Sequence, residues 1–250
     1  LFDRGGADPR PRSLGVGAQP TPVNTPSIFN LAFVECYNWT GRECDLARHT
    51  ALPLLSPAIM GNAPEAAGAR ASRDPEVQAR AAALGVPGLT DAVITRALGA
   101  YIATLVTPSR FDRFLRGDLD ALTPLERRGY ALFKEIGCVS CHQGVAVGGN
   151  LFERLGVVGA PPSARGGGTE ADLGRFNVTR DDADRRVFRV APLRNVALTA
   201  PYFHDGAVAA LDDAVQIMAR IQLGTELSPD ETAALVAFLT ALTGPPPEDA

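Results

Sequence analysis

The sequence predicts an all-α protein, and three observations carry that prediction. Apolar residues recur at helical spacing between Leu89 and Leu105. Residues 123–126 and 228–231 each have the pattern of a capping box, with proline at the first helical position. Because long segments rich in glycine and proline separate these helices, we expect two helical halves joined by long loops.

Composition limits the classes of partner. The chain has 250 residues, of which 46% are hydrophobic and 21% charged, so it is long enough for one or two domains with a buried core. The net charge is −4, and no Lys/Arg block is longer than a pair. We therefore expect no nucleic-acid partner. No apolar stretch approaches the roughly 18 residues of a membrane span, so none is predicted.

The N-terminal half begins with an irregular segment. Residues 1–27 are rich in Gly, Pro and Arg without apolar periodicity, and we expect a loop that lies on another part of the chain. The helix at 89–105 has Thr90 as its N-cap. Its apolar positions are Ile94, Leu98, Tyr101, Ile102 and Leu105. After Thr107-Pro108-Ser109, residues 110–120 are interpreted as a polar connection. The predicted domains are therefore 1–109 and 110–250.

Three helices and one long loop are predicted in the C-terminal half. The helix that starts at Thr123 presents one face made of Leu125, Gly129, Leu132, Phe133 and Ile136. Residues 156–174 are expected to form a long surface loop. Residues 211–218 are expected to be helical. The last helix buries Leu235, Phe238, Leu239 and Leu242 and ends at Gly244-Pro245.

The motif Cys138-Val139-Ser140-Cys141-His142 carries the chemistry. We expect it at a helix start, where positions i, i+3 and i+4 share one face. The two thiols then add to the vinyl groups of a haem, and His142 ligates the iron. A thioredoxin-like CxxC or a zinc site is the alternative, but no second Cys/His pair has zinc spacing, and no βαβ pattern surrounds the motif. A covalent haem indicates redox chemistry outside the cytoplasm.

A haem that only transfers electrons needs a second axial ligand, and methionine raises its reduction potential. Met218 lies in the same half as the motif and is the predicted ligand; Met60 is interpreted as a core residue. Cys36 and Cys44 remain as either a disulfide in an oxidising compartment or two small buried side chains. His49 is interpreted as a surface residue. His204 is interpreted as a structural histidine, with a haem or interface contact as the alternative.

Several blocks resemble one family. Residues 192–206, PLRNVALTAPYFHDG, resemble a signature of bacterial dihaem cytochrome c peroxidases and the related MauG proteins. The resemblance extends over essentially the whole chain through residues 24–27, 39–42, 111–118, 148–149 and 238–244. It implies two cytochrome c-like domains, each with one haem c, in a periplasmic enzyme. Electrons from a small cytochrome c or cupredoxin enter at the C-terminal haem and pass to the N-terminal haem, where hydrogen peroxide is reduced to water.

The resemblance also implies site residues. It assigns Cys138, Cys141 and His142 to the C-terminal haem, and it places Met218 where peroxidases have methionine and MauG-like members have tyrosine. Trp39 matches the position between the two haems, where it relays electrons. Asn24, Thr199 and Pro201 match the residues that hold Ca²⁺ through oxygen atoms.

The sequence departs from the family at two places. No CxxCH precedes residue 138, although the first haem requires one. Leu1 matches a position just after that motif's histidine, so we expect a piece of a longer two-haem protein rather than loss of the haem. Ile59 precedes Met60 where the family commonly has an acid/base glutamate, and isoleucine moves no proton.

The leading hypothesis is a cytochrome c peroxidase in which this chain holds the electron-transfer haem. The alternatives are a monohaem electron carrier and a MauG-like oxidase. A homodimer is left open.

Overall fold

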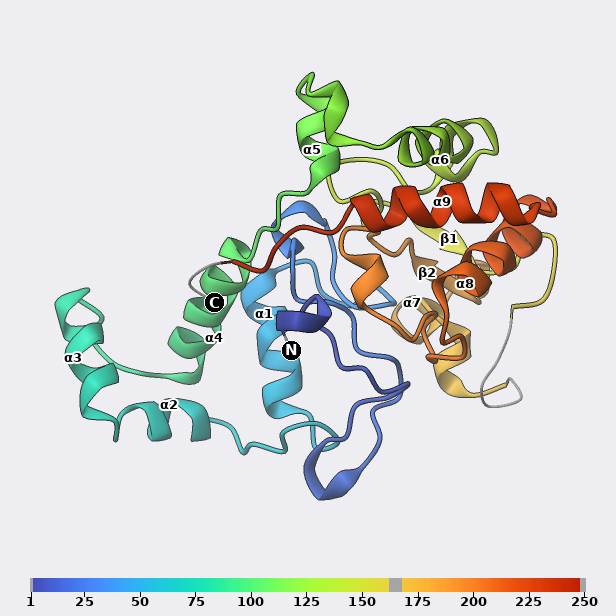
Figure 1. Ribbon diagram of the computed structural model, residues 1–250. Coiled ribbons are helices and arrows are strands. Elements are labelled where there is room, and N and C mark those ends of the chain that lie inside the picture. Colours follow the sequence, from blue (N-terminus) through green and yellow to red (C-terminus); the bar gives the residue numbers. More distant parts are fainter. Residues whose placement is uncertain (1, 162–167, 248–250) are drawn as a thin grey trace.

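The computed structural model describes residues 2–161 and 168–247, and helices dominate it (Figure 1). The helices are α1 Leu46–Leu55, α2 Ala66–Ala71, α3 Pro75–Ala83, α4 Asp91–Thr104, α5 Arg110–Leu115, α6 Pro124–Glu135, α7 Phe176–Thr179, α8 Leu211–Met218 and α9 Pro229–Ala241. Two short strands, β1 Phe152–Arg154 and β2 Val187–Arg189, pair antiparallel with Glu153 opposite Phe188. Sequence patterns missed this strand pair because each strand has only three residues.

Local capping signals start the three helices that the sequence predicts most directly. Thr90 accepts a hydrogen bond from the backbone of Val93 at the start of α4, and Thr123 and Ser228 form capping boxes at α6 and α9. All three predicted helix starts are confirmed. Residues 211–218 are helical, as predicted. The α9 helix ends at Ala241, ahead of the predicted stop at 244–245.

The C-terminal half is built on the crossing of α6 and α9 (Figure 1). A Cβ atom on Gly129 would lie 1.9 Å from the carbonyl oxygen of Ala234, so only glycine lets the two backbones approach this closely. The predicted buried face of α9 is confirmed, and its residues join Phe111 and Phe133 in one core. The face predicted for α6 is partly wrong. Leu125 is 47% exposed, because the capping box turns Glu126 inward instead.

Residues 110–120 are not the polar connection that the sequence predicts. They include α5, whose Phe111 packs edge-on against Phe238 with ring centroids 5.2 Å apart. The segment forms a helix because Ser109 and Asp112 make a capping box, and because Phe111 has a buried aromatic partner far along the chain. Tertiary burial thus overrides the local polarity.

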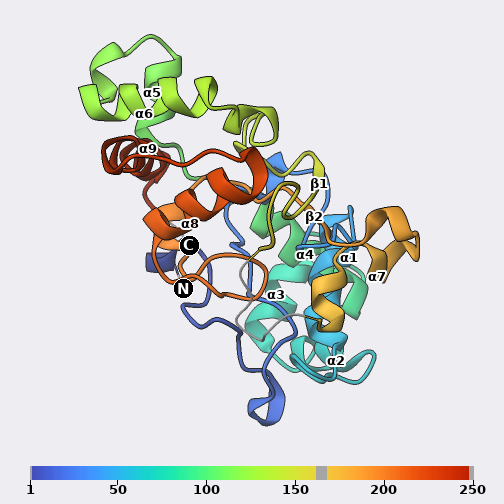
Figure 2. The same cartoon turned by 90° about the vertical axis from the view of Figure 1, so that its right-hand side faces the viewer.

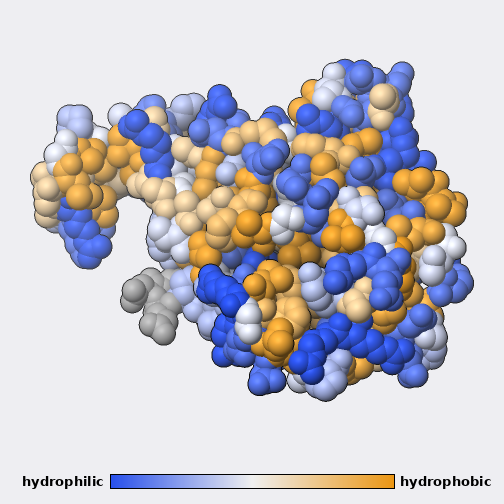
Figure 3. Space-filling view, turned by 90° about the horizontal axis from the view of Figure 1, so that it is seen from above, coloured by the Kyte–Doolittle hydropathy of each residue, from blue (hydrophilic) through white to orange (hydrophobic). Residues whose placement is uncertain are grey.

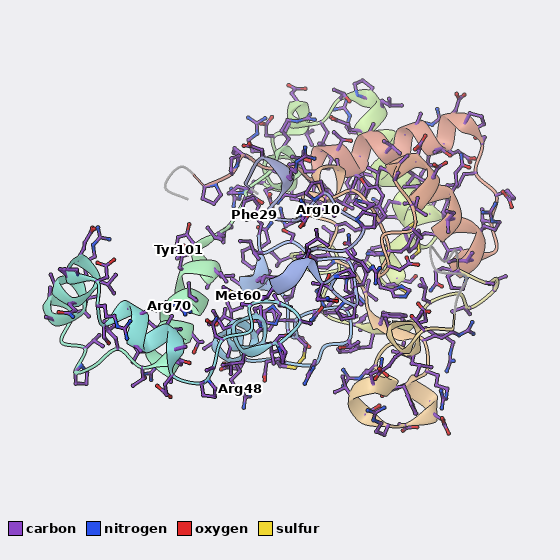
Figure 4. All side chains as sticks on the ribbon, turned by 90° about the horizontal axis from the view of Figure 1, so that it is seen from below. Arg10, Phe29, Arg48, Met60, Arg70 and Tyr101 are labelled. Carbon is purple, nitrogen blue, oxygen red and sulfur yellow. A yellow bond between two sulfur atoms is a disulfide. The ribbon has the colours of Figure 1, made fainter. Side chains whose placement is uncertain are left out.

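In the N-terminal half α1 packs on α4 (Figures 1 and 2). The α2 helix, which also contacts α4, and α3 form an arm that extends from the rest of the molecule (Figure 1). No residue of α3 is buried, and Leu84 after it is 80% exposed. The space-filling view shows apolar surface on this arm (Figure 3). Tyr101, on the apolar side of α4, is 43% exposed and is labelled in Figure 4.

The loops follow the predictions in outline. Between 2 and 27 the chain forms short 3₁₀ turns and an isolated antiparallel bridge between Leu14 and Pro20, and Gly5 lies against Thr199. Within 156–174, a 3₁₀ turn at Glu170–Leu173 interrupts the expected loop, and residues 162–167 lie outside the described part of the chain.

The two halves contain matching backbone clamps. The amide of Asn30 donates to the Leu105 carbonyl, and the Thr107 amide donates to the side-chain oxygen of Asn30. In the same way the amide of Asn195 donates to the Leu242 carbonyl, and the Gly244 amide donates to the side chain of Asn195. Each asparagine has positive φ, close to 60°, and starts a 3₁₀ turn. The helix ends after α4 and α9 are therefore held by equivalent devices.

Candidate functional site

The CxxCH motif directly follows α6, and it begins a 3₁₀ turn rather than the α-helical start that the sequence predicts. The α6 helix ends at Glu135, and Gly137 adopts φ 104°, which a side chain would disfavour. A 3₁₀ turn then spans Cys138–Ser140, and the amide of His142 donates to the Cys138 carbonyl at 3.0 Å. This turn still brings the two thiols and the imidazole together.

The imidazole of His142 is held in its neutral form. Its Nδ1 lies 3.1 Å from the carbonyl oxygen of Ala191, and because a carbonyl only accepts, Nδ1 carries the proton. Burial lowers the pKa of His142 to about 4, so the ring is neutral at pH 7. Nε2 is therefore the atom with a lone pair for a metal.

The motif opens into a cavity with a largely apolar lining. Cys138, Cys141, His142 and Met218 all line this cavity, together with Phe133. Met218 is the last residue of α8 and is half-buried, and a π-helical turn, Ala219–Leu223, follows it. The structure thus brings the predicted second axial ligand into the same cavity as the thiols and the histidine.

The two thiols do not have the character of reactive thiolates. Burial raises the pKa of Cys138, and burial together with the charge of Glu153 raises the pKa of Cys141. Thiol–disulfide catalysts depend on the opposite shift. A zinc site has no support in the described residues, since no three His, Cys, Asp or Glu side chains there are grouped to hold a metal. An apolar cavity, two neutral thiols and a neutral imidazole fit a c-type haem.

Trp39 lines the same cavity. Its indole N–H donates to the Asn24 carbonyl at 2.7 Å, and its ring lies edge-on to His204, with centroids 6.4 Å apart. His204 is buried, bonds to Asp172 at 2.8 Å and packs on Phe188, so the structural interpretation of this histidine is compatible with its contacts.

The three residues matched to a calcium site also line this cavity. Asn24 is 5% exposed, and its side-chain N–H donates to the carbonyls of Arg10 and Pro11 at 3.3 Å. Thr199 precedes the cis peptide bond that joins Ala200 to Pro201. Side-chain and carbonyl oxygens are the ligands that Ca²⁺ prefers, so this donor set fits that ion.

Two interpretations from the sequence are wrong, and one open question is settled. Met60 is not a core residue: it is 50% exposed on the turn after α1 (Figure 4). His49 is not a surface residue, because its ring stacks on Tyr37 with centroids 4.9 Å apart and burial lowers its pKa. Cys36 and Cys44 form a disulfide.

Sequence patterns missed the ion pair that holds the segment after β2 against α5. Arg194 is buried and forms two hydrogen bonds with Asp112, at 2.8 and 2.6 Å. Both residues belong to blocks that the family resemblance identified. Their partnership had no signal in the sequence because 82 positions separate them.

Comparisons with known proteins point to one family. A family model described as "Di-haem cytochrome c peroxidase" matches residues 2–120. The chain is 42% identical to the cytochrome c551 peroxidase of Pseudomonas aeruginosa, over 97% of this chain and 71% of that protein. It is 41% identical to the cytochrome c peroxidase Ccp of Escherichia coli, over 97% of this chain, and it spans about half (52%) of that protein.

A solved structure shows the same fold. The crystal structure of a MauG-like protein associated with microbial copper homeostasis superposes with a TM-score of 0.84 at 28% identity, covering 98% of this chain and 82% of that one. No helix in the described residues is long and apolar enough to cross a membrane. By sequence and by fold, the chain belongs to the family of dihaem cytochrome c peroxidases and MauG proteins.

Proposed function

We propose that this chain is the electron-transfer part of a periplasmic dihaem cytochrome c peroxidase. One observation carries the proposal: Cys138, Cys141, His142 and Met218 line a single apolar cavity, in a chain 42% identical to a named peroxidase. The thiols of Cys138 and Cys141 attach the haem, and His142 and Met218 ligate its iron. When bound, the haem supplies a one-electron ferric/ferrous couple.

The matching clamps support two cytochrome c-like domains, 1–109 and 110–250. Asn30 and Asn195 hold equivalent helix ends, and the clamped Thr107 lies beside the proposed boundary. The family resemblance implies one haem for each of the two domains.

Trp39 and the calcium site belong to the path between the two haems. Trp39 lines the cavity of the C-terminal haem, and its N–H bond to Asn24 couples the proposed relay to a proposed Ca²⁺ ligand. Asn24, Thr199 and Pro201 supply the oxygen ligands, which hold the N-terminal segment against the C-terminal half.

The proposed reaction takes two electrons and two protons to reduce one hydrogen peroxide to two waters. A small cytochrome c or cupredoxin supplies the electrons one at a time. Ile59 has no proton to give, so another group of the complete protein must act as the acid. The Cys36–Cys44 disulfide and the covalent haem both favour the periplasm.

A MauG-like oxidase is the second candidate, favoured by the fold match to a MauG-like protein. Met218 and the greater identity to the peroxidase favour the first candidate. A monohaem electron carrier is the third.

The test is peroxide-dependent oxidation of a reduced small cytochrome by the complete protein, produced in a periplasm with c-type haem maturation. We expect turnover in the wild type and loss of turnover in His142→Ala. A complete protein that holds both haems and oxidises no donor with peroxide would contradict the proposal.

A further inference from the structure

We propose that Asp112 and Arg194 are positioning residues for His142 and that, through the Ala191 carbonyl, they lower the reduction potential of the haem that His142 ligates. The inference rests on the proposed haem at Cys138, Cys141 and His142. The ligands alone do not determine how the imidazole ring of His142 is oriented.

The Ala191 carbonyl is fixed by the segments on both sides of it. Residues 190–194 run along 145–149, where the Gly149 amide donates to the Val190 carbonyl at 2.9 Å and the Leu193 amide to the Ala146 carbonyl at 3.2 Å. A Cβ atom on Gly148 would lie 2.4 Å from the Ala191 oxygen. The hydrogen bond from His142 Nδ1 thus ends on a carbonyl with little freedom to move.

Arg194 is the anchor at the end of this segment. Its Nε donates to the Val145 carbonyl at 2.6 Å, which closes the contact with the loop after CxxCH. Its two terminal nitrogens bind Asp112, and the Arg194 side chain is only 6% exposed. Asp112 is in turn held by the Ser109 amide at 2.7 Å, at the start of α5. The pair therefore ties the segment that carries Ala191 to a helix of the core.

The Asp112–Arg194 pair is not needed to form the clamp that both halves share, in which an asparagine binds the backbone after a helix. Asn30 and Asn195 occupy equivalent places, and the residue before each is Phe29 in the first half and Arg194 in the second. The first half thus forms its clamp without an arginine. This difference points to a role of Arg194 toward the histidine in its own half.

The direction of the effect follows from ligand basicity. A strong Nδ1–H bond to a carbonyl makes the imidazole a better electron donor, which favours ferric iron. If Asp112 no longer holds Arg194, the Ala191 carbonyl gains freedom and the bond weakens. The reduction potential then rises, whereas loss of a methionine ligand lowers it.

The experiment is a spectroelectrochemical titration of the haem-loaded chain as wild type, Asp112→Asn and Arg194→Lys. We expect both variants to favour ferrous haem by about tenfold, which for one electron is about 59 mV. The matched control is Glu126→Gln, because Glu126 is a buried carboxylate that binds Arg110 of the same α5 helix through two oxygens. The control should lose stability but keep the wild-type potential.

The outcomes separate this inference from the proposed function. Wild-type protein without haem contradicts the proposed function, and the inference with it. Haem-loaded Asp112→Asn or Arg194→Lys at the wild-type potential overturns the inference alone. An equal rise in Glu126→Gln also overturns it, because general loosening would then explain the shift. If Asp112→Asn does not retain haem, Arg194→Lys decides, since it keeps the charge and can keep one bond.

Discussion

Asn30 and Asn195 donate side-chain hydrogen bonds to the same atom, the hydroxyl oxygen of Thr107, and both bonds measure 2.8 Å. Thr107 is fully buried, so water cannot replace either bond. A Cβ atom on Gly244, the residue equivalent to Thr107, would lie 2.5 Å from the Thr107 carbonyl oxygen. The two clamped helix ends therefore meet each other, and one hydroxyl joins the two halves of the chain.

Thr107→Val should destabilise the protein strongly, because it leaves two buried amide groups without an acceptor. At about 1–3 kcal/mol for each of the two unsatisfied donors, we expect a loss of about 2–6 kcal/mol in the free energy of unfolding, measured in urea. Thr104→Val is the control: Thr104 is exposed and bonds only within its own helix, so its change should stay within about 0.5 kcal/mol. Equal stabilities of the two variants would contradict the role of Thr107.

Met218→Ala should remove the sulfur-to-iron absorption of the oxidised haem and lower its reduction potential, because a methionine ligand favours ferrous iron. Optical spectra and a redox titration measure both effects. Met60→Ala is the control, since Met60 is 50% exposed and does not line the cavity. An unchanged spectrum in Met218→Ala would refute the ligand assignment.

Removal of Ca²⁺ by a chelator should lower the melting temperature of the wild type, because the ion links the N-terminal segment to the C-terminal half. Asn24→Ala should melt at the same temperature with and without the chelator. Asn62→Ala is the control and should keep the wild-type response to the chelator, because Asn62 bonds to Leu54, away from the predicted ligands. If neither the chelator nor added Ca²⁺ changes the melting temperature of the wild type, the calcium site is excluded.

Acid should weaken the Asp112–Arg194 pair over a defined range. Burial raises the pKa of Asp112, but hydrogen bonds from Arg194 and Ser109 outweigh burial and lower it from 3.8 to about 2. A depressed pKa contributes stability that is present above pH 4 and is lost as the pH falls toward 2. The difference corresponds to about 2 kcal/mol. Between pH 5 and pH 2.5, the free energy of unfolding in urea should fall in the wild type and should fall less in Asp112→Asn. Equal losses in the two proteins would contradict a stabilising Asp112–Arg194 pair.

The sequence predicted the elements whose signals are local. Three helix starts could be predicted because an N-cap side chain bonds to the backbone within three residues. These N-caps are Thr90, Thr123 and Ser228. The CxxCH motif and Met218 followed from ligand chemistry, and the structure places both in one cavity. The two-domain division at 109/110 stays a prediction.

The errors arise where distant contacts decide. The segment 110–120, predicted as a polar connection, contains α5 because Phe111 packs against Phe238. His49, predicted at the surface, is partly buried because its ring stacks on Tyr37. Arg194 could not be paired with Asp112 from patterns alone, since nothing local marks a bond across 82 positions. The CxxCH motif begins a 3₁₀ turn instead of an α-helix, directly after Gly137 with its positive φ.

The proposed function depends on a covalent haem on Cys138 and Cys141. Its most direct test is the intact mass of this chain under denaturing conditions, after production in a periplasm with c-type maturation. We expect the mass of the chain plus one haem in the wild type, and the mass of the chain alone when both cysteines are changed to alanine. Wild-type protein with the mass of the chain alone would contradict it.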